Sequence, residues 1–120
     1  MRAAETAGSA TIDTLEALYQ FREPDEVRAY LARNPDLIDL LVDASTKIPE
    51  FLPTDGSMIL EVVWDPDDEE EEENDELVAV VPTRLKWDEV RPRLDRLTRE
   101  WLIPTARFAA GRFIVDVEYR

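Results

Sequence analysis

The side chains of this chain that could do chemistry are carboxylates, because the chain contains no histidine and no cysteine. Histidine is the commonest general acid–base near neutral pH and the commonest metal ligand, and cysteine supplies thiolates and disulfides. Acidic residues are plentiful instead: ten of the twelve residues from Asp65 to Glu76 are Asp or Glu. Carboxylates are therefore the most numerous groups of this chain that could take part in chemistry, either through their charge or by holding a metal.

The acidic run is compatible with a calcium site, with a mimic of nucleic-acid phosphates, or with a docking surface for a basic partner. The EF-hand spacing and its glycine are missing, which argues against calcium. A run of like charges repels itself and stays solvated, so its ordinary interpretation is a polar loop between two strands. If the run binds a partner, a neighbouring tryptophan can anchor the contact. The candidate partner-binding residues are Trp64, Asp65, Asp67, Asp68, Glu69, Glu70, Glu71, Glu72 and Glu73.

An enzyme of this composition would need paired carboxylates, a Ser–Lys pair or a carboxylate-bound metal. Asp36, Asp39 and Asp43 recur at helical spacing and could hold magnesium, although the wet side of an amphipathic helix shows the same pattern. Ser45 and Lys47 are two residues apart and do not share a helix face. No glycine-rich phosphate loop is present. We therefore expect no catalytic residues, no metal and no cofactor, with a carboxylate-only metal enzyme as an alternative.

The net charge of −14 is unevenly distributed. The acidic run holds 10 of the 28 acids, which leaves 18 acids against 14 bases elsewhere. Such a charge repels nucleic-acid phosphates and favours a basic protein partner. Arginines also recur along residues 86–102, but acids between them neutralise that face, so direct binding of nucleic acid is not expected. These arginines are Arg91, Arg93, Arg96 and Arg99.

The chain is of single-domain length, 120 residues. Residues 1–10 are small and polar, which predicts a disordered N-terminus, and residues 11–120 form one domain that includes the acidic loop 65–76. No apolar run approaches the roughly 18 residues of a membrane span, and the N-terminus has no signal-peptide core. We therefore expect a cytoplasmic protein with no membrane contact.

Helical periodicity predicts three N-terminal helices. Thr11 can cap the first, over residues 11–21, and Pro24 suits the first turn of the second. Asn34 and Pro35 begin the third helix, which runs to about Ile48 and stops before Pro49 and Pro53.

The second half of the chain predicts strand, strand, helix, strand. The strands lie at 57–64, 77–82 and 112–119, and the helix at 86–102 carries Trp87 and Trp101 on its apolar stripe. We expect an α+β fold in which three N-terminal helices precede β-β-α-β. The small three-stranded sheet would be mostly antiparallel, in the order 2-1-3, and packed by helices.

Four segments resemble small acidic bacterial proteins that are largely uncharacterised. These segments are the Asn34–Pro35 helix break, "LEVVWDP" (60–66), the Glu100–Trp101 helix end and "DVEY" (116–119), and the resemblance spans about residues 26–120. The acidic run is longer here than in that type. Because some such proteins accompany a toxin-like neighbour, the resemblance implies an antitoxin-like protein that neutralises or regulates a basic partner. A DNA mimic that inhibits a nucleic-acid-binding protein is an alternative.

Overall fold

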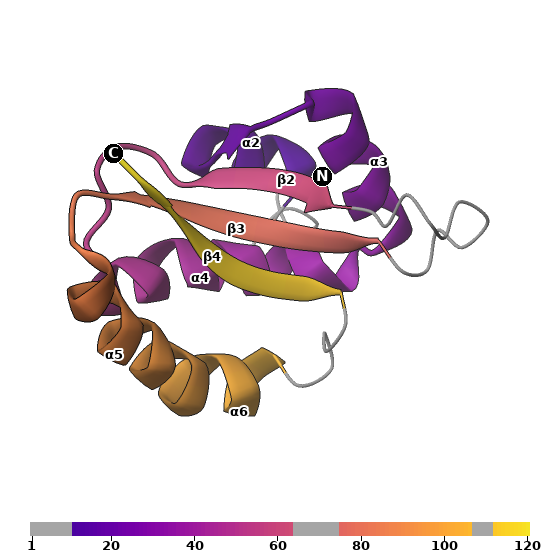
Figure 1. Ribbon diagram of the computed structural model, residues 1–120. Helices are drawn as coiled ribbons and strands as arrows, with labels where there is room; N and C mark the ends of the chain where they lie inside the picture. The colour runs from indigo at the N-terminus through magenta and orange to yellow at the C-terminus, as the bar shows by residue number, and fades with distance from the viewer. Residues whose placement is uncertain (1–10, 64–74, 107–111) are drawn as a thin grey trace.

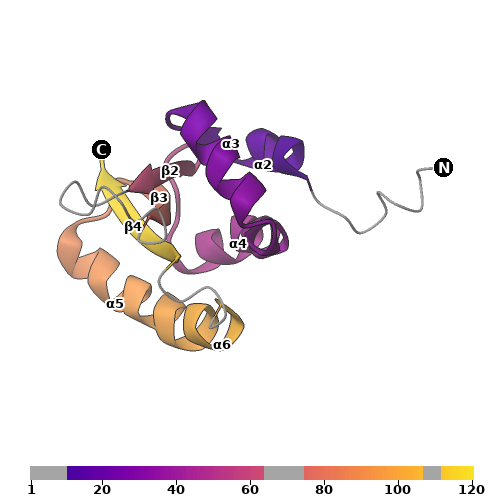
Figure 2. The ribbon, with the colours of Figure 1, turned by 90° about the vertical axis from the view of Figure 1, so that its right-hand side faces the viewer.

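The computed structural model describes residues 11–63, 75–106 and 112–120, in which helices cover one face of a four-stranded mixed sheet (Figures 1 and 2). The predicted α+β class is confirmed. The N-terminal segment 1–10 and most of the predicted acidic loop, residues 65–74, lie outside the described residues.

Three helices open the described chain, as predicted: α2 (Ile12–Leu18), α3 (Pro24–Arg33) and α4 (Asp36–Phe51). The hydroxyl of Thr11 accepts the Thr14 backbone N–H, which caps α2. The predicted helix stop at Pro49 is wrong, because α4 continues through this proline to Phe51.

A short strand that the sequence pattern did not predict follows α2. Tyr19 is extended (φ −129°, ψ 159°), which ends α2 before residue 21 and turns the chain into β1 (Gln20–Phe21). The N–H of Gln20 donates to the Met58 carbonyl, and that of Arg22 donates to the Leu60 carbonyl. These bonds pair β1 in parallel with β2 (Ile59–Val63) and give the sheet a fourth strand.

The strand order is β1-β2-β3-β4, so the predicted order 2-1-3 is wrong. β2 pairs antiparallel with β3 (Glu76–Thr83), as the predicted hairpin requires, but β4 (Phe113–Tyr119) pairs in parallel with β3. The chain between β3 and β4 forms α5 (Trp87–Leu97) and further helical turns. This helical crossover returns the chain to the starting end of β3, and β4 therefore runs parallel to its neighbour.

The α5 segment is one continuous helical stretch with two irregularities. Pro92 lies inside the helix rather than at its start, and Thr98–Leu102 form a π-helical segment before the short α6 (Ile103–Ala106). The predicted core position of Trp101 is confirmed, because this residue is 7% exposed. The prediction for Trp87 is wrong: it stands at the first turn of α5 and is 56% exposed.

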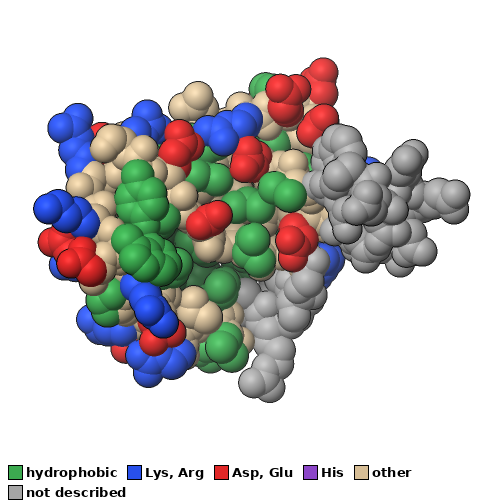
Figure 3. Space-filling view, viewed as in Figure 1, with side chains coloured by type: hydrophobic (Ala, Val, Ile, Leu, Met, Phe, Trp, Pro, Cys, Tyr) green, Lys and Arg blue, Asp and Glu red, His purple; other side chains and the backbone are tan. Residues whose placement is uncertain are grey.

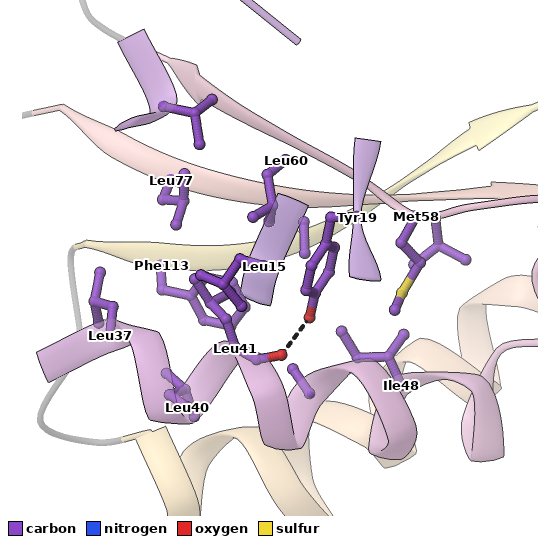
Figure 4. Packing of buried hydrophobic residues seen from close by; sticks show 14 of the residues in the cluster. Leu15, Tyr19, Leu37, Leu40, Leu41, Ile48, Met58, Leu60, Leu77 and Phe113 are labelled. Atoms are coloured by element: carbon purple, nitrogen blue, oxygen red, sulfur yellow. Dashed lines mark hydrogen bonds between the residues drawn. The ribbon is translucent and has the colours of Figure 1, made fainter. Parts of the chain in front are cut away.

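The main core lies between the helices and the inner face of the sheet (Figure 4). Leu37, Leu41 and Ile48 of α4 point toward the strands, spaced at helical intervals. The buried hydroxyl of Tyr19 donates to the Leu41 carbonyl at 2.6 Å, and burial raises the pKa of this phenol, with a further contribution from Asp43. No helix among the described residues has the length and apolar character of a membrane span.

Candidate interaction surface

The sequence-predicted site lies outside the described residues. Trp64, Asp65 and Asp67 through Glu73 all fall within residues 64–74, so their prediction stays a prediction. The structure does describe both borders of this segment. Val63 ends β2 at 45% exposure and pairs with Glu76, the first residue of β3. The segment that contains the acidic run therefore connects two hydrogen-bonded neighbouring strands.

The face of the sheet turned away from the helices, here called the open face, combines apolar and acidic side chains (Figure 3). Ile59, Val78 and Val80 form a second cluster there, separate from the main core and only 2–5% exposed. Side chains alternate along a strand, so Ile114 and Asp116, which alternate with Phe113 and other core-facing residues of β4, belong to the open face. The carboxylates on this face are Glu61, Glu76, Asp116 and Glu118.

Arg22 links opposite sides of the open face. Its guanidinium donates to Glu61 of β2 at 2.9 Å and to Glu118 of β4 at 3.0 Å. These bonds, the one to Glu118 foremost, raise the pKa of Arg22. Because β1 and β4 are the two edges of the sheet, the contact requires a strong twist that brings the end of β4 toward β1. The twist and this arginine explain how Ile59 and Val80 are buried without a covering helix.

A network of polar side chains ties the start of β4 to the helices, next to the end of the acidic run. Arg112 makes a bidentate ion pair with Asp36 of α4, at 2.7 and 3.1 Å, and donates to the side-chain carbonyl of Asn34 at 2.9 Å. The Tyr30 hydroxyl donates to the carbonyls of Asp75 and Arg112, at 3.0 and 3.1 Å. The hydrogen bond from Arg112 lowers the pKa of Asp36, and burial raises that of Tyr30.

This network also changes the expected role of Asn34. The sequence predicted that Asn34 caps α4, but its side-chain N–H donates backward to the Tyr30 carbonyl at the end of α3. Its oxygen is occupied by Arg112. Asn34 therefore closes one helix and positions β4, and α4 begins without a side-chain cap.

The three aspartates proposed for magnesium lie along α4, as their spacing predicted. Asp36 is paired with Arg112, and Asp43 accepts a hydrogen bond from the indole N–H of Trp101 at 3.3 Å. In residues 11–63, 75–106 and 112–120, no three acidic side chains converge in a geometry that could hold a metal ion. The structure thus gives two of these aspartates partners within the fold.

The arginines of α5 take part in ion pairs and packing at its surface. Arg99 pairs with Asp95 at 3.2 Å and Arg96 pairs with Glu100 at 3.1 Å, both at i,i+4 spacing. Glu89 and Arg93 have the same spacing, but no ion pair joins them in the described structure. Glu89 instead accepts the Lys86 backbone N–H, and Arg93 points to the carbonyl of Phe51, at 3.5 Å.

A groove of about 450 Å³ follows the flank of α5 turned away from α4. Because Arg93 and Arg96 face Phe51 at the end of α4, the groove-lining positions lie on the opposite side of the helix. The described lining residues are Arg91, Pro92, Leu94, Asp95 and Thr98. The lining has charges of both signs and no cluster of groups suited to acid–base or nucleophilic chemistry.

The outer edge of β4 is the other accessible feature. Every residue from Leu77 to Thr83 of β3 is buried, whereas every residue from Ile114 to Arg120 is at least partly exposed. No strand in the described part of the chain pairs with the outer side of β4. The opposite edge, β1, is only two residues long. Among the described residues the sheet thus has one long edge with no neighbouring strand, here called the free edge, beside its acidic open face.

The chain matches no known family model, and comparisons with curated proteins and with solved structures found no match. The site residues must therefore be interpreted from geometry. Sequence reasoning missed the bridging role of Arg22 and the edge position of Asp116. Both depend on which strands are neighbours, although Glu61 and Glu118 were already visible as acids within apolar strands.

Proposed function

We propose that this protein binds a basic protein partner and neutralises or regulates it, in the manner of an antitoxin, without catalysing a reaction. The observation that carries the proposal is that negative charge is concentrated on the accessible surface of the sheet. The chain has a net charge of −14, and its acidic run joins two strands whose open face bears further carboxylates. Opposite charge on a partner would increase the rate of encounter and fix its orientation.

The open face also supplies apolar contacts that an interface core requires. Val63 is 45% exposed and Ile114 is 39% exposed, and both lie among carboxylates of this face. Two exposed aromatic side chains, Trp87 and Tyr119, lie where β3 and β4 end and α5 begins. Aromatic residues dominate the binding energy of many interfaces, because they bury a large area at a low cost in conformational entropy. In this proposal charge attracts the partner and these side chains hold it.

A capture experiment tests the proposal. The tagged full chain is used to capture protein from cells that carry its gene, alongside a variant with Asn or Gln at residues 67–73. A matched control removes seven exposed carboxylates elsewhere: Asp13, Glu23, Asp25, Glu26, Asp39, Glu50 and Asp88. We expect a basic protein to bind the natural chain with strong salt dependence, to bind the control almost as well, and to be lost from the 67–73 variant. Equal capture by all three proteins would contradict the role of the run.

The same capture distinguishes the DNA-mimic alternative. If the captured protein binds DNA and duplex DNA displaces it competitively, the acidic surface acts as a substitute for phosphates. A basic partner with no affinity for DNA supports the antitoxin-like proposal.

A further inference from the structure

The backbone of β4 presents a row of hydrogen-bonding groups to solvent. Leu77 donates its N–H to the Arg112 carbonyl, and Arg120 donates its N–H to the Thr83 carbonyl. In this parallel register, the even-numbered residues of β4 bond to β3, and those between them point to the outer side. Phe113, Val115, Val117 and Tyr119 thus have their N–H and C=O groups at the free edge.

One of these outward groups is occupied by the chain itself. The N–H of Val117 donates to the carboxylate of Asp116, the preceding residue, at 2.8 Å. An exposed edge strand can pair with other chains, and proteins often guard such edges with charged side chains. The Asp116 carboxylate therefore satisfies one of the four outward N–H donors of this edge while no other strand is bound.

We propose that β4 is a strand-addition site, on which an extended segment of a basic partner adds as a fifth strand. In this arrangement the partner's carbonyl takes the Val117 N–H, and the Asp116 carboxylate turns to a Lys or Arg of the added segment. Main-chain hydrogen bonds would supply affinity, and alternate side chains would supply specificity. This inference rests on the proposed function and adds to it the binding mode and the kind of segment that is recognised.

The charges beside the edge favour a basic segment over a second copy of this chain. Asp116, Glu118 and Glu61 lie on the open face beside this edge. Glu118 and Glu61 share the single guanidinium of Arg22, so the group keeps a net negative charge. A second copy would bring another net charge of −14 and its own Asp116 to the same edge. A segment that alternates cationic and apolar residues would place its cations toward Asp116 and its apolar side chains beside Val115 and Val117 on the other face.

The test is an NMR titration of the isotope-labelled full chain with an eight-residue peptide of alternating Arg and Val, acetylated and amidated at its ends. The matched control peptide is methylated on its four central amide nitrogens, so that it keeps every charge but cannot donate hydrogen bonds there. We expect saturable amide shifts at residues 113–119 with the first peptide. Because each lost hydrogen bond costs about 1 kcal/mol, the methylated peptide should bind about tenfold more weakly or worse.

Two protein variants complete the design. Asp116→Asn can still accept the Val117 N–H but has no charge, and it should bind the arginine peptide about fivefold more weakly. Asp25→Asn, on α3, makes the same change in net charge and should leave binding unchanged. Both variants retain the strand sequence outside the substituted side chain, and their amide spectra report directly whether the fold is kept.

Each other outcome overturns the strand-addition proposal. Equal binding of the two peptides, or shifts that avoid residues 113–119, would show that charge alone holds the peptide. In that case the capture experiment would still yield a basic partner, bound through the acidic run. Absence of peptide binding would also overturn strand addition. The capture experiment with the 67–73 variant tests separately whether the protein binds a basic partner. Concentration-dependent shifts of the free chain at residues 113–119 would identify the occupant as a second copy.

Discussion

Arg22 and Glu118 are joined by a 3.0 Å ion pair although they come from opposite edges of the sheet, at the end of β1 and near the end of β4. Their side chains are 43% and 40% exposed, so the pair alone contributes little to stability. Its importance lies in geometry. The same guanidinium also holds Glu61 of β2, so one arginine links β2 to β4 across β3, beside the cluster of Ile59, Val78 and Val80.

Replacing Arg22 by Met should therefore loosen the open face more than the ion pairs alone suggest. We expect a loss of about 1 kcal/mol in unfolding free energy, measured by urea denaturation, and faster amide exchange at the end of β4. Arg28→Met is the matched control, because Arg28 is similarly exposed but pairs with Asp13 and Glu16 on the neighbouring helix α2. If both variants leave exchange in β4 unchanged, Arg22 does not hold the strand.

Asp36→Asn should reveal the contribution of the pair with Arg112. The Arg112 hydrogen bond lowers the pKa of Asp36 in the folded chain, so this pair stabilises the fold above the unfolded-state value near 4, and its contribution is lost as the pH falls through the lower folded-state pKa. The side chain of Asp36 is 49% exposed, which limits the expected cost at pH 7 to about 1 kcal/mol.

The control for this prediction is Asp39→Asn in the same first turn of α4, which removes a charge from the same helix end. The difference between the two variants in urea midpoint, measured from pH 7 down to pH 3, isolates the contact with Arg112. A difference that does not shrink below pH 4 would assign the effect to something other than the ionised pair.

The sequence predicted the local elements well because helix stripes and strand patterns are local signals. Thr11, Pro24 and the apolar stripe of α4 were sufficient to place the three N-terminal helices. Strand order is not a local property. No residue near β4 indicates that this strand pairs with β3 rather than β2. The helical crossover determines the pairing, and its path is known only once the packing of α5 is known. The two-residue β1 is too short for any period to be visible.

Only the negative charge of the candidate site could be predicted from the sequence. The acidic run is evident in the sequence, but the open face appears only when β2, β3 and β4 are placed side by side. The exposure of Trp87 was missed for a related reason. Its spacing matches the stripe that buries Val90 and Leu97, yet it stands one turn earlier, beyond the end of that packed interface. A periodic pattern indicates which side of a helix is apolar, and it does not indicate how far the neighbouring elements extend.

Substitution of the two described tryptophans of the same stripe should change stability to very different extents. Trp101→Ala removes a 7%-exposed side chain and its hydrogen bond to Asp43, and should cost about 3 kcal/mol of unfolding free energy. Trp87→Ala removes a 56%-exposed side chain and should change stability by about 0.5 kcal/mol or less, while it weakens capture of the basic partner. Urea denaturation and the capture experiment measure these effects. A large loss of stability in Trp87→Ala would place this residue in the core and remove it from the proposed surface.

Tyr19→Phe tests the buried hydroxyl that links the chain before β1 to α4. Burial, with a smaller contribution from Asp43, raises the pKa of Tyr19 above its ordinary value, so the folded chain holds the phenol neutral where the unfolded chain ionises it. The neutral phenol's contribution is therefore fully present below about pH 10 and is lost as the pH rises from there toward the folded-state pKa. Near pH 7 the variant should lose about 1 kcal/mol, the usual contribution of one hydrogen bond, here the 2.6 Å bond to Leu41.

The decisive comparison is between pH 8 and pH 11. The natural chain should lose more unfolding free energy over this interval than Tyr19→Phe, because the variant has no phenol at this position to ionise. Tyr119→Phe is the control, since Tyr119 is 49% exposed. Comparing the two variants shows whether the alkaline difference depends on the buried position of Tyr19. Equal losses in the natural chain and Tyr19→Phe would show that Tyr19 ionises as readily in the folded chain as in the unfolded one. The hydroxyl, which Figure 4 shows pointing to the Leu41 carbonyl, would then be open to solvent in the folded chain.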